Sequence, residues 1–360
     1  MMPTLFGGIL TVLVLYTVLI GWGWRRAQQQ LHVSAEGDPP PISVIVAARN
    51  EAGTLPSLLD ALAAQTHPNH EVVLVDDAST DDTAAVITDW AENRPYATVV
   101  RVTEPAPPRK KNALARGIEA ATHDLLAFTD ADCTPPPTWL STLAQTHEDT
   151  EEDCVLVGYS PLRGPGLVGR FSRYETLVAG LYTGAAIGWG RPYMAVGRNL
   201  SYSRGVFEAT GGFAPTDDAL SGDDDLFVQA VHRRTDAPIR ALLNSRTFVP
   251  AEAPSSWTDW WRQRRRHVSA GRHYSWVVGL HLTVLHFSLI LLWLAPLLLG
   301  KLGVGLLATG LLARHSQLGP AARAVEETDL LALFPLWELG YALYHVIVVP
   351  VGLLWPPNRW

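Results

Sequence analysis

The chain has 360 residues, of which 48% are hydrophobic and 18% charged, with a mean hydropathy of +0.09 and a net charge of −7 at pH 7. This acidic balance argues against a nucleic-acid-binding protein, which normally presents a broad basic face. The two cysteines, Cys133 and Cys154, are too few for a disulfide framework, and we expect them to be free thiols. The apolar content points instead to a membrane.

An uncharged apolar stretch covers residues 5–24 and ends at Arg25 and Arg26. It is about long enough to cross a bilayer as a helix. A cleaved signal peptide carries its basic residues before the apolar stretch, and here they follow it. We therefore predict that residues 1–26 form a transmembrane anchor whose carboxyl end faces the cytoplasm.

Three further apolar stretches, 276–300, 302–312 and 330–355, predict about three transmembrane helices within residues 276–356. The middle stretch is short and rich in glycine, so a re-entrant or tilted segment is an alternative. We expect a loop over residues 314–327, whose arginines suit the cytoplasmic side. The sequence thus predicts an integral protein of a bacterial-type inner or plasma membrane, with the part of the chain between these stretches in the cytoplasm.

The middle of the chain, residues 38–250, has ordinary polar composition and predicts one cytoplasmic domain. Short runs rich in β-branched residues alternate there with stretches that have helical periodicity. Because the strands are apolar nearly throughout, we expect a parallel sheet covered on both faces. The pattern predicts an α/β doubly wound sheet, with strands at 42–47, 72–75, 99–102 and 125–128 and helices at 55–62 and 112–121.

Polar residues follow three of these strands, at the sheet edge where such folds bind ligands. Glu51 comes shortly after the first strand, Asp76 and Asp77 after the second, and Asp130 and Asp132 after the fourth. The first pair of aspartates could equally cap the following helix. The second pair supplies the carboxylates that a hard divalent cation prefers, although a solvated turn is the alternative.

The stretches Pro41-Ile-Ser-Val-Ile-Val-Ala-Ala-Arg-Asn-Glu51 and Val75-Asp-Asp-Ala-Ser-Thr-Asp-Asp-Thr83 together resemble the inverting family 2 glycosyltransferases. The resemblance implies the GT-A fold and a nucleotide-sugar donor, which we expect to be linked to UDP. In that family the carboxylate matching Asp77 binds uracil. The Asp-x-Asp of Asp130 and Asp132 resembles the family motif that holds Mg²⁺ or Mn²⁺ on the donor diphosphate.

Lys110 lies in Lys-Lys-Asn-Ala-Leu, which resembles the family's Lys-x-x-Ala-Leu, and it is one of only three lysines in the chain. A cation there would meet the donor phosphate or nucleotide. A glycine-rich phosphate loop is missing from the sequence, which argues against a dehydrogenase or an NTPase. The resemblance implies donor contacts at Ala47, Arg49, Glu51, Asp77, Lys110, Asp130, Gln263 and Arg266.

Inversion needs a carboxylate that takes a proton from the acceptor hydroxyl as the new bond forms. The segment Ser221-Gly-Asp-Asp-Asp-Leu-Phe227 resembles the Glu-Asp motif of the family. Alignment from the glycine makes Asp224 the base, which we favour, and alignment from Asp225 makes it Asp223. The alternative is an acidic first helical turn favoured by the helix dipole.

Gln263-Arg-Arg-Arg-His267 resembles the Gln-x-x-Arg-Trp motif of membrane-embedded members such as ceramide glucosyltransferases and polysaccharide synthases. The resemblance places Arg266 on the diphosphate and His267 where the family has its acceptor-side Trp. The same segment also predicts an interfacial amphipathic helix over residues 255–275. The stretch Gly197–Ser203 resembles the acceptor-side strand, with Arg198 and Asn199 as candidates.

A catalytic domain bracketed by membrane helices lies where a lipid hydroxyl surfaces, so we expect a membrane lipid, polyprenol or carotenoid as acceptor. Residues 168–187 fit this expectation as a helix on the membrane surface, or else a packed core helix. A processive polysaccharide synthase is the main alternative. A catalytically silent nucleotide-sugar-binding scaffold is a third hypothesis.

Overall fold

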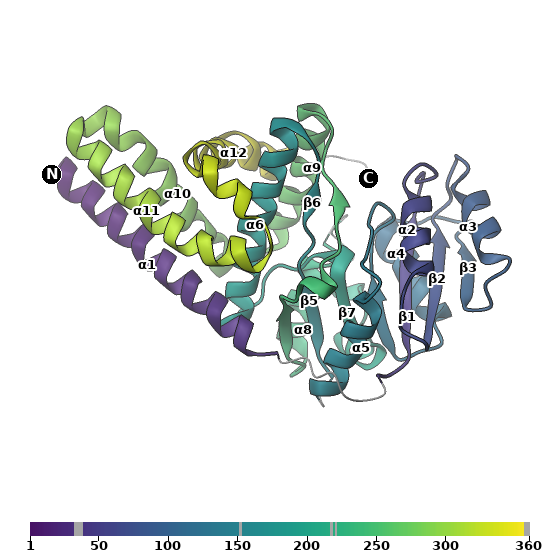
Figure 1. Cartoon of the computed structure of the whole chain (residues 1–360). Coiled ribbons are helices and arrows are strands. Elements are labelled where there is room, and N and C mark those ends of the chain that lie inside the picture. The colour runs from purple at the N-terminus through teal and green to yellow at the C-terminus, as the bar shows by residue number, and fades with distance from the viewer. Residues whose placement is uncertain (32–38, 151–152, 217–218, 220–221, 356–360) are drawn as a thin grey trace. The chain divides into compact units, whose positions relative to one another are not determined.

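The computed structural model describes residues 1–31, 39–150, 153–216, 219 and 222–355, in two compact units (Figure 1). One unit comprises Ala27–Arg163 and Gly190–Glu252, and we call it the α/β unit. The other comprises Met1–Arg26, Gly164–Trp189 and Ala253–Trp360, and we call it the helical unit.

A mixed seven-stranded sheet forms the α/β unit, in the order β3-β2-β1-β4-β7-β5-β8. The four predicted strands β1 to β4 are all present and parallel to one another. Strand β7 lies antiparallel to both of its neighbours, which the sequence did not predict. The strands are β1 Ile42–Ala48, β2 His70–Asp76, β3 Ala97–Arg101, β4 Leu125–Phe128, β5 Val155–Gly158, β7 Leu200–Ser203 and β8 Ile239–Leu242, and a second sheet pairs β6 Leu162–Arg163 with β9 Ala251–Glu252.

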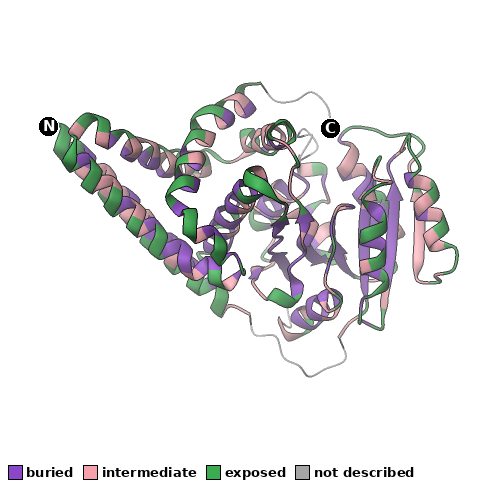
Figure 2. Ribbon diagram, turned by 45° about the horizontal axis from the view of Figure 1, so that its top comes forward, coloured by how far each residue is buried: buried purple, intermediate pink, exposed green. Residues whose placement is uncertain are grey.

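Figure 2 shows the central strands β1, β2 and β4 as buried, as expected for apolar strands covered on both faces, whereas the edge strand β3 is only half-buried. Leu55, Leu58, Leu59 and Leu62 are buried at the helical spacing that the sequence predicted. The helices are α2 Leu55–Ala63, α3 Thr83–Ala91, α4 Arg109–Ala120, α5 Trp139–Thr150, α7 Arg204–Thr210 and α8 Asp225–Arg234.

The strand order defines where a ligand can bind. The chain runs from β1 outward through β2 to β3 and then crosses to β4, on the other side of β1. The carboxyl ends of β1 and β4 therefore flank a topological switch point, the usual ligand site of open α/β sheets. Glu51 follows β1 and Asp130 follows β4, so both residues lie at this edge of the sheet.

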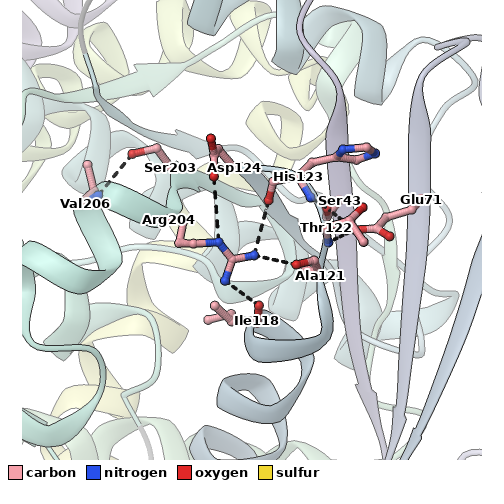
Figure 3. Close-up of polar contacts among 10 residues, drawn as sticks. All are labelled: Ser43, Glu71, Ile118, Ala121, Thr122, His123, Asp124, Ser203, Arg204 and Val206. Carbon is pink, nitrogen blue, oxygen red and sulfur yellow. Dashed lines mark hydrogen bonds and ion pairs between the residues drawn. The ribbon is translucent and has the colours of Figure 1, made fainter.

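Polar contacts secure the opposite edge of the sheet (Figure 3). Arg204, at the start of α7, donates to the carbonyl oxygens of Ile118 and Ala121, each at 2.7 Å. These carbonyls belong to the last turn of α4, which leaves them without helical partners. Nearby, the carboxylate of Glu71 accepts from the backbone N–H of Thr122 and, at 2.5 Å, from the hydroxyl of Ser43. The first cluster joins α7 to the end of α4, and the second joins β1 and β2 to the segment before β4, at the amino end of the parallel strands.

We expect Arg204→Met to lower the free energy of unfolding by about 1–3 kcal/mol, because carbonyls that lose a charged donor remain partly shielded from water. Chemical denaturation of the full chain in detergent measures the change. Arg116→Met is the matched control, since Arg116 is exposed on α4 and pairs only with exposed Glu119 in the described contacts. An equal loss in both variants would contradict a capping role for Arg204.

Among the residues that the structure describes, three segments are long and apolar enough to cross a membrane: Met2–Gln29, Trp276–Leu299 and Thr328–Leu354. The first confirms an apolar N-terminal helix of spanning length where we expected an anchor, and the other two lie in the C-terminal region, where we expected about three. The helices of the helical unit are α1 Met2–Gln29, α6 Gly166–Gly188, α9 Trp257–Ala270, α10 Trp276–Leu299, α11 Lys301–Ala324 and α12 Phe334–Leu354.

The predicted loop over residues 314–327 is wrong, because α11 continues through Arg314 to Ala324. A re-entrant segment is also not seen here, since the helix is continuous. Its glycines let it pack closely: a Cβ atom at Gly303 would lie 1.9 Å from the carbonyl oxygen of Ala295 on α10. The short glycine-rich stretch is thus one half of a longer packing helix.

A buried polar network explains how α11 holds an arginine inside the helical unit. Arg314 is 1% exposed and donates to both carboxylate oxygens of Glu338 on α12, at 3.0 and 2.7 Å. It also donates to the hydroxyl of Tyr182 on α6 at 2.7 Å, and the hydroxyl of Tyr174 donates to Glu338. The charge is therefore paired and fully hydrogen-bonded, which burial in an apolar unit requires.

Helix α6 belongs to the helical unit, whereas we had placed its residues within the domain 38–250. Its Glu175 is buried and accepts from Trp260 at 2.6 Å and from Arg264 at 3.0 Å. Both donors lie on α9, which begins after Ser256 as its N-cap. The expected helix within residues 255–275 is thus present and packs against α6.

Candidate active site

A cluster of oppositely charged side chains lies at the carboxyl edge of the sheet. The ammonium of Lys110 is 3.0 Å from Asp130 Oδ1 and 2.9 Å from Asp223 Oδ2. Lys110 is in the first turn of α4, Asp130 follows β4, and Asp223 precedes α8. The side chains are 18%, 34% and 7% exposed, so the cluster is shielded but reachable. The fold thus brings together three residues that the sequence predicted separately.

Carboxylates crowd around Asp130. Burial raises the pKa of Asp132 above its ordinary value, and the charge of Asp130 raises it further, while Arg198 opposes the shift. Burial likewise raises the pKa of Glu51. A hydrogen bond from Thr54 lowers this pKa, while the negative charges of Asp132 and Asp130 raise it further. A bound cation would relieve this repulsion.

The donor atoms of Asp130 and Asp132 fit a hard divalent cation such as Mg²⁺ or Mn²⁺. Within the described part of the chain, no group of three or more His, Cys, Asp or Glu side chains is arranged to hold a metal ion. Phosphate oxygens of a substrate and water would have to complete the coordination. This arrangement suits a metal that arrives with a phosphorylated ligand.

Asp224 is next to Asp223 of the cluster in the chain, and both of its carboxylate oxygens accept hydrogen bonds from backbone N–H groups. Its Oδ2 accepts from the backbone N–H of Gly197 at 3.0 Å, and its Oδ1 accepts from that of Asp225 at 2.7 Å. It is the N-cap of α8, so the acidic helix start that we considered as an alternative is also real. Burial raises the pKa of Asp224, the charge of Asp223 raises it further, and Lys110 opposes both. A carboxylate with a raised pKa is a stronger general base.

The loops after β1 and β2 hold each other in place. Asn50 and Ala78 both have positive φ, +56° and +49°, which is uncommon for residues other than glycine. The side-chain oxygen of Asn50 accepts from the backbone N–H of Thr80 at 2.8 Å. Such strained, cross-linked backbone is frequent at ligand sites.

Asp77 does not cap the next helix, because α3 begins only after Asp82. Its carboxylate accepts instead from Nε of Arg109 at 3.0 Å, and its carbonyl oxygen accepts from the same guanidinium at 2.7 Å. We did not predict Arg109 as a site residue. The sequence signal that could have indicated Arg109 is the run of three basic residues Arg109-Lys110-Lys111. In the structure each of the three has a different partner.

Two other predicted donor residues lie at the end of β1. Ala47 is half-buried within the strand, and Arg49 is exposed just beyond it. The guanidinium is thus at the ligand edge of the sheet and open to solvent. Their contact with a donor stays a prediction.

The two acceptor-side candidates differ. Arg198 donates to the hydroxyl of Ser160 at 2.5 Å and acts electrostatically on Asp132, so it reaches the cluster. Asn199 is 0% exposed and its amide bonds only to the protein in the described contacts: it accepts from Trp139 at 3.0 Å and donates to the carbonyls of Tyr159 and Thr247 at 2.8 and 2.7 Å. We therefore correct the expectation for Asn199, which holds three segments together instead of facing an acceptor.

Gln263, Arg266 and His267 lie on α9 in the helical unit. Gln263 and Arg266 are half-buried there, and His267 is exposed. Their neighbours Trp260 and Arg264 make the contacts to Glu175. A donor contact for Gln263 and Arg266, and an acceptor contact for His267, stay predictions.

A long central part of the chain matches a known protein family. Residues 43–209 match the model described as glycosyl transferase family 2. This range includes Glu51, Asp77, Lys110, Asp130 and Asp132, while Asp223 and Asp224 lie beyond it.

Individual proteins are also similar. The chain is 26% identical over 276 residues to a probable glycosyltransferase, YdaM, of Bacillus subtilis, covering 73% of this chain and 59% of that protein. It is 35% identical over 99 residues to an undecaprenyl-phosphate 4-deoxy-4-formamido-L-arabinose transferase of Sodalis glossinidius, covering 27% and 30%. The chain thus spans less than two thirds of the length of these relatives.

Among solved structures, the mannosyltransferase PcManGT of Pyrobaculum calidifontis, in complex with GDP-Man and Mn²⁺, has a TM-score of 0.61 at 21% identity, covering 94% of this chain and 99% of that one. This likeness agrees with the expected GT-A fold. Residues 43–209 of the chain, which include strands β1 to β5 and β7, thus match glycosyl transferase family 2, the family that the sequence motifs resemble.

Proposed function

We propose that the chain is an inverting glycosyltransferase that moves a sugar from a nucleotide-sugar to the hydroxyl of a membrane lipid. The observation that carries this proposal is the charged cluster of Lys110, Asp130 and Asp223 at the switch point of a family 2 domain. A lysine and carboxylates placed at this edge suit a diphosphate and a divalent cation. The donor base is proposed to be uracil, recognised by Asp77.

In the proposed reaction, the donor and the acceptor bind on different sides of the charged cluster. On the donor side, Lys110 would bind the diphosphate, and Asp130 and Asp132 would hold a divalent cation against it. A bound Mg²⁺ or Mn²⁺ would offset negative charge on the departing nucleoside diphosphate. On the acceptor side, Asp224 takes the hydroxyl proton while the acceptor oxygen bonds to the anomeric carbon and the bond to the diphosphate breaks. One in-line displacement inverts the configuration at that carbon.

A lipid acceptor is supported by the helical unit and by the relatives. In the described part of the chain, three segments are long and apolar enough to cross a membrane, and Trp257 on α9 is 52% exposed. Exposed aromatic and basic side chains on one helix suit a membrane interface. The relative from Sodalis glossinidius is named for undecaprenyl phosphate, which supports a lipid with a polyprenyl chain as the acceptor. We propose that the acceptor in this chain's reaction is such a lipid with a free hydroxyl, and not a carotenoid. Arg25 and Arg26, at the end of α1, favour a cytoplasmic α/β unit.

The acceptor class is tested with the full chain in detergent, a panel of radiolabelled UDP- and GDP-sugars, Mn²⁺ or Mg²⁺, and either a bacterial lipid extract or soluble saccharides. We expect label to enter the organic phase as a single product on thin-layer chromatography. Label found only in water-soluble saccharide would contradict the lipid acceptor. A ladder of long products on a gel would favour the processive synthase.

The raised pKa of Asp224 predicts a pH dependence. A base must be deprotonated to act, so activity is present above its pKa and lost as pH falls through it. Because burial and Asp223 raise the pKa of Asp224, the acid limb of kcat/KM should lie above the ordinary Asp value of about 3.9. Initial rates measured from about pH 4 to pH 8 check this. A rate that stays constant down to about pH 4 would contradict the assignment.

A further inference from the structure

Lys110 makes an unusual pair of contacts for a donor-binding residue. Its ammonium lies between Asp130 Oδ1 at 3.0 Å and Asp223 Oδ2 at 2.9 Å. The first carboxylate is a candidate metal ligand, and the second adjoins the candidate base Asp224. The ammonium of Lys110 therefore lies between a carboxylate that would bind the metal ion, Asp130, and a carboxylate next to the candidate base, Asp223.

The neighbours of Lys110 have other partners. Arg109 is bound to Asp77, and Lys111 is 2% exposed and donates to the carbonyl oxygens of Thr216 and, at 3.0 Å, Ala219. Lys111 thereby binds two residues, Thr216 and Ala219, that precede Asp223 in the chain. Among these three basic residues, Lys110 alone contacts the carboxylate cluster in the described structure.

A lysine ammonium and a divalent cation are poor neighbours on the same carboxylate. Both would bind Asp130, and their mutual repulsion weakens the binding of either. The ammonium has three donor hydrogens on a flexible stem, so it can turn toward a new anion. The diphosphate of a donor supplies such an anion at the same place where the metal is needed.

We propose that Lys110 is an internal counter-ion that occupies the metal position on Asp130 in the donor-free protein and transfers to the donor diphosphate when the metal binds. The inference rests on the proposed function and deepens it. It assigns the order of binding: the metal binds weakly alone and tightly together with a nucleoside diphosphate. In the donor-free protein, Lys110 also keeps Asp130 and Asp223 from repelling each other.

Metal binding without turnover tests this role. Free Mn²⁺ is titrated against the full chain in detergent and followed by electron paramagnetic resonance, with no nucleotide present. We expect Lys110→Gln to bind Mn²⁺ at least about tenfold more tightly than the wild-type protein. Arg116→Gln, which removes an exposed positive charge from the same helix, should bind like wild type. Equal or weaker Mn²⁺ binding by Lys110→Gln would overturn the proposal.

A second titration uses the wild-type protein alone, so it does not depend on the folding of a variant. We expect UDP or GDP to tighten Mn²⁺ binding at least about 100-fold, because the nucleotide supplies ligands and draws Lys110 away. Mn²⁺ bound as tightly without nucleotide as with it would overturn the counter-ion role. If neither nucleotide binds at all, the proposed function fails, while the first titration still decides the role of Lys110.

Discussion

Asp224→Asn is expected to lower kcat for sugar transfer by about 10²- to 10⁴-fold while donor binding is retained. The asparagine has nearly the same shape but cannot accept the proton of the acceptor hydroxyl. One oxygen can still accept from a backbone N–H, as Asp224 does from Gly197 and Asp225. Single-turnover rates and calorimetric titration of the donor separate the loss of chemistry from any loss of binding.

Asp225→Asn is the matched control, because it removes the same charge from the next residue. Asp225 accepts from the backbone N–H of Ala195 at 2.8 Å and has no proposed part in proton transfer. We expect it to keep its activity within about tenfold of wild type. Asp223→Asn tests the other alignment of this motif. An inactive Asp223→Asn together with an active Asp224→Asn would move the base to Asp223.

Arg314→Met is expected to lower the free energy of unfolding by about 3–5 kcal/mol, because it leaves the buried carboxylate of Glu338 without its counter-charge. Glu338 is 0% exposed, so water cannot replace the lost donors. Glu338→Gln should be costly for the converse reason. Thermal or denaturant unfolding in detergent measures these changes.

The double variant Arg314→Met/Glu338→Met should recover most of the loss, since an apolar pair of similar volume needs no desolvated charges. Arg323→Met is the control, because Arg323 is exposed on the same helix. A double variant no more stable than Arg314→Met would show that the two residues do not act as a pair. In that case the network of Tyr174 and Tyr182 would be the important part.

The parallel half of the sheet could be predicted closely from the sequence. β1 to β4 contain short runs rich in apolar and β-branched residues, and this pattern differs from the helical periodicity of the segments between them. β7 was not predicted as a central strand, because its four residues, Leu200–Ser203, include two serines and hold their place through neighbours on both sides. Its antiparallel direction is a tertiary feature that no local pattern encodes.

Site residues could be predicted where they belong to a short sequence motif. They could not be predicted where the role of a side chain depends on a partner far away in the sequence. Asp130 and Lys110 were predicted from motifs, and the fold places them 3.0 Å apart. Asn199 was misjudged, because its partners Trp139, Tyr159 and Thr247 come from three other segments. Arg314 was misjudged for the same reason: a charge in the sequence suggests a loop, whereas its partner Glu338 lies on another helix.

Release of nucleoside diphosphate is the measurement that tests the central claim most directly. The detergent-purified full chain is incubated with UDP- and GDP-sugars, a lipid extract and Mn²⁺ or Mg²⁺, beside an Asp130→Asn variant. We predict release that requires the metal, one donor and the lipid, and that falls at least about 100-fold in the variant. Release that does not depend on Asp130, or none with any donor, would contradict the assignment of this edge of the sheet as a donor site.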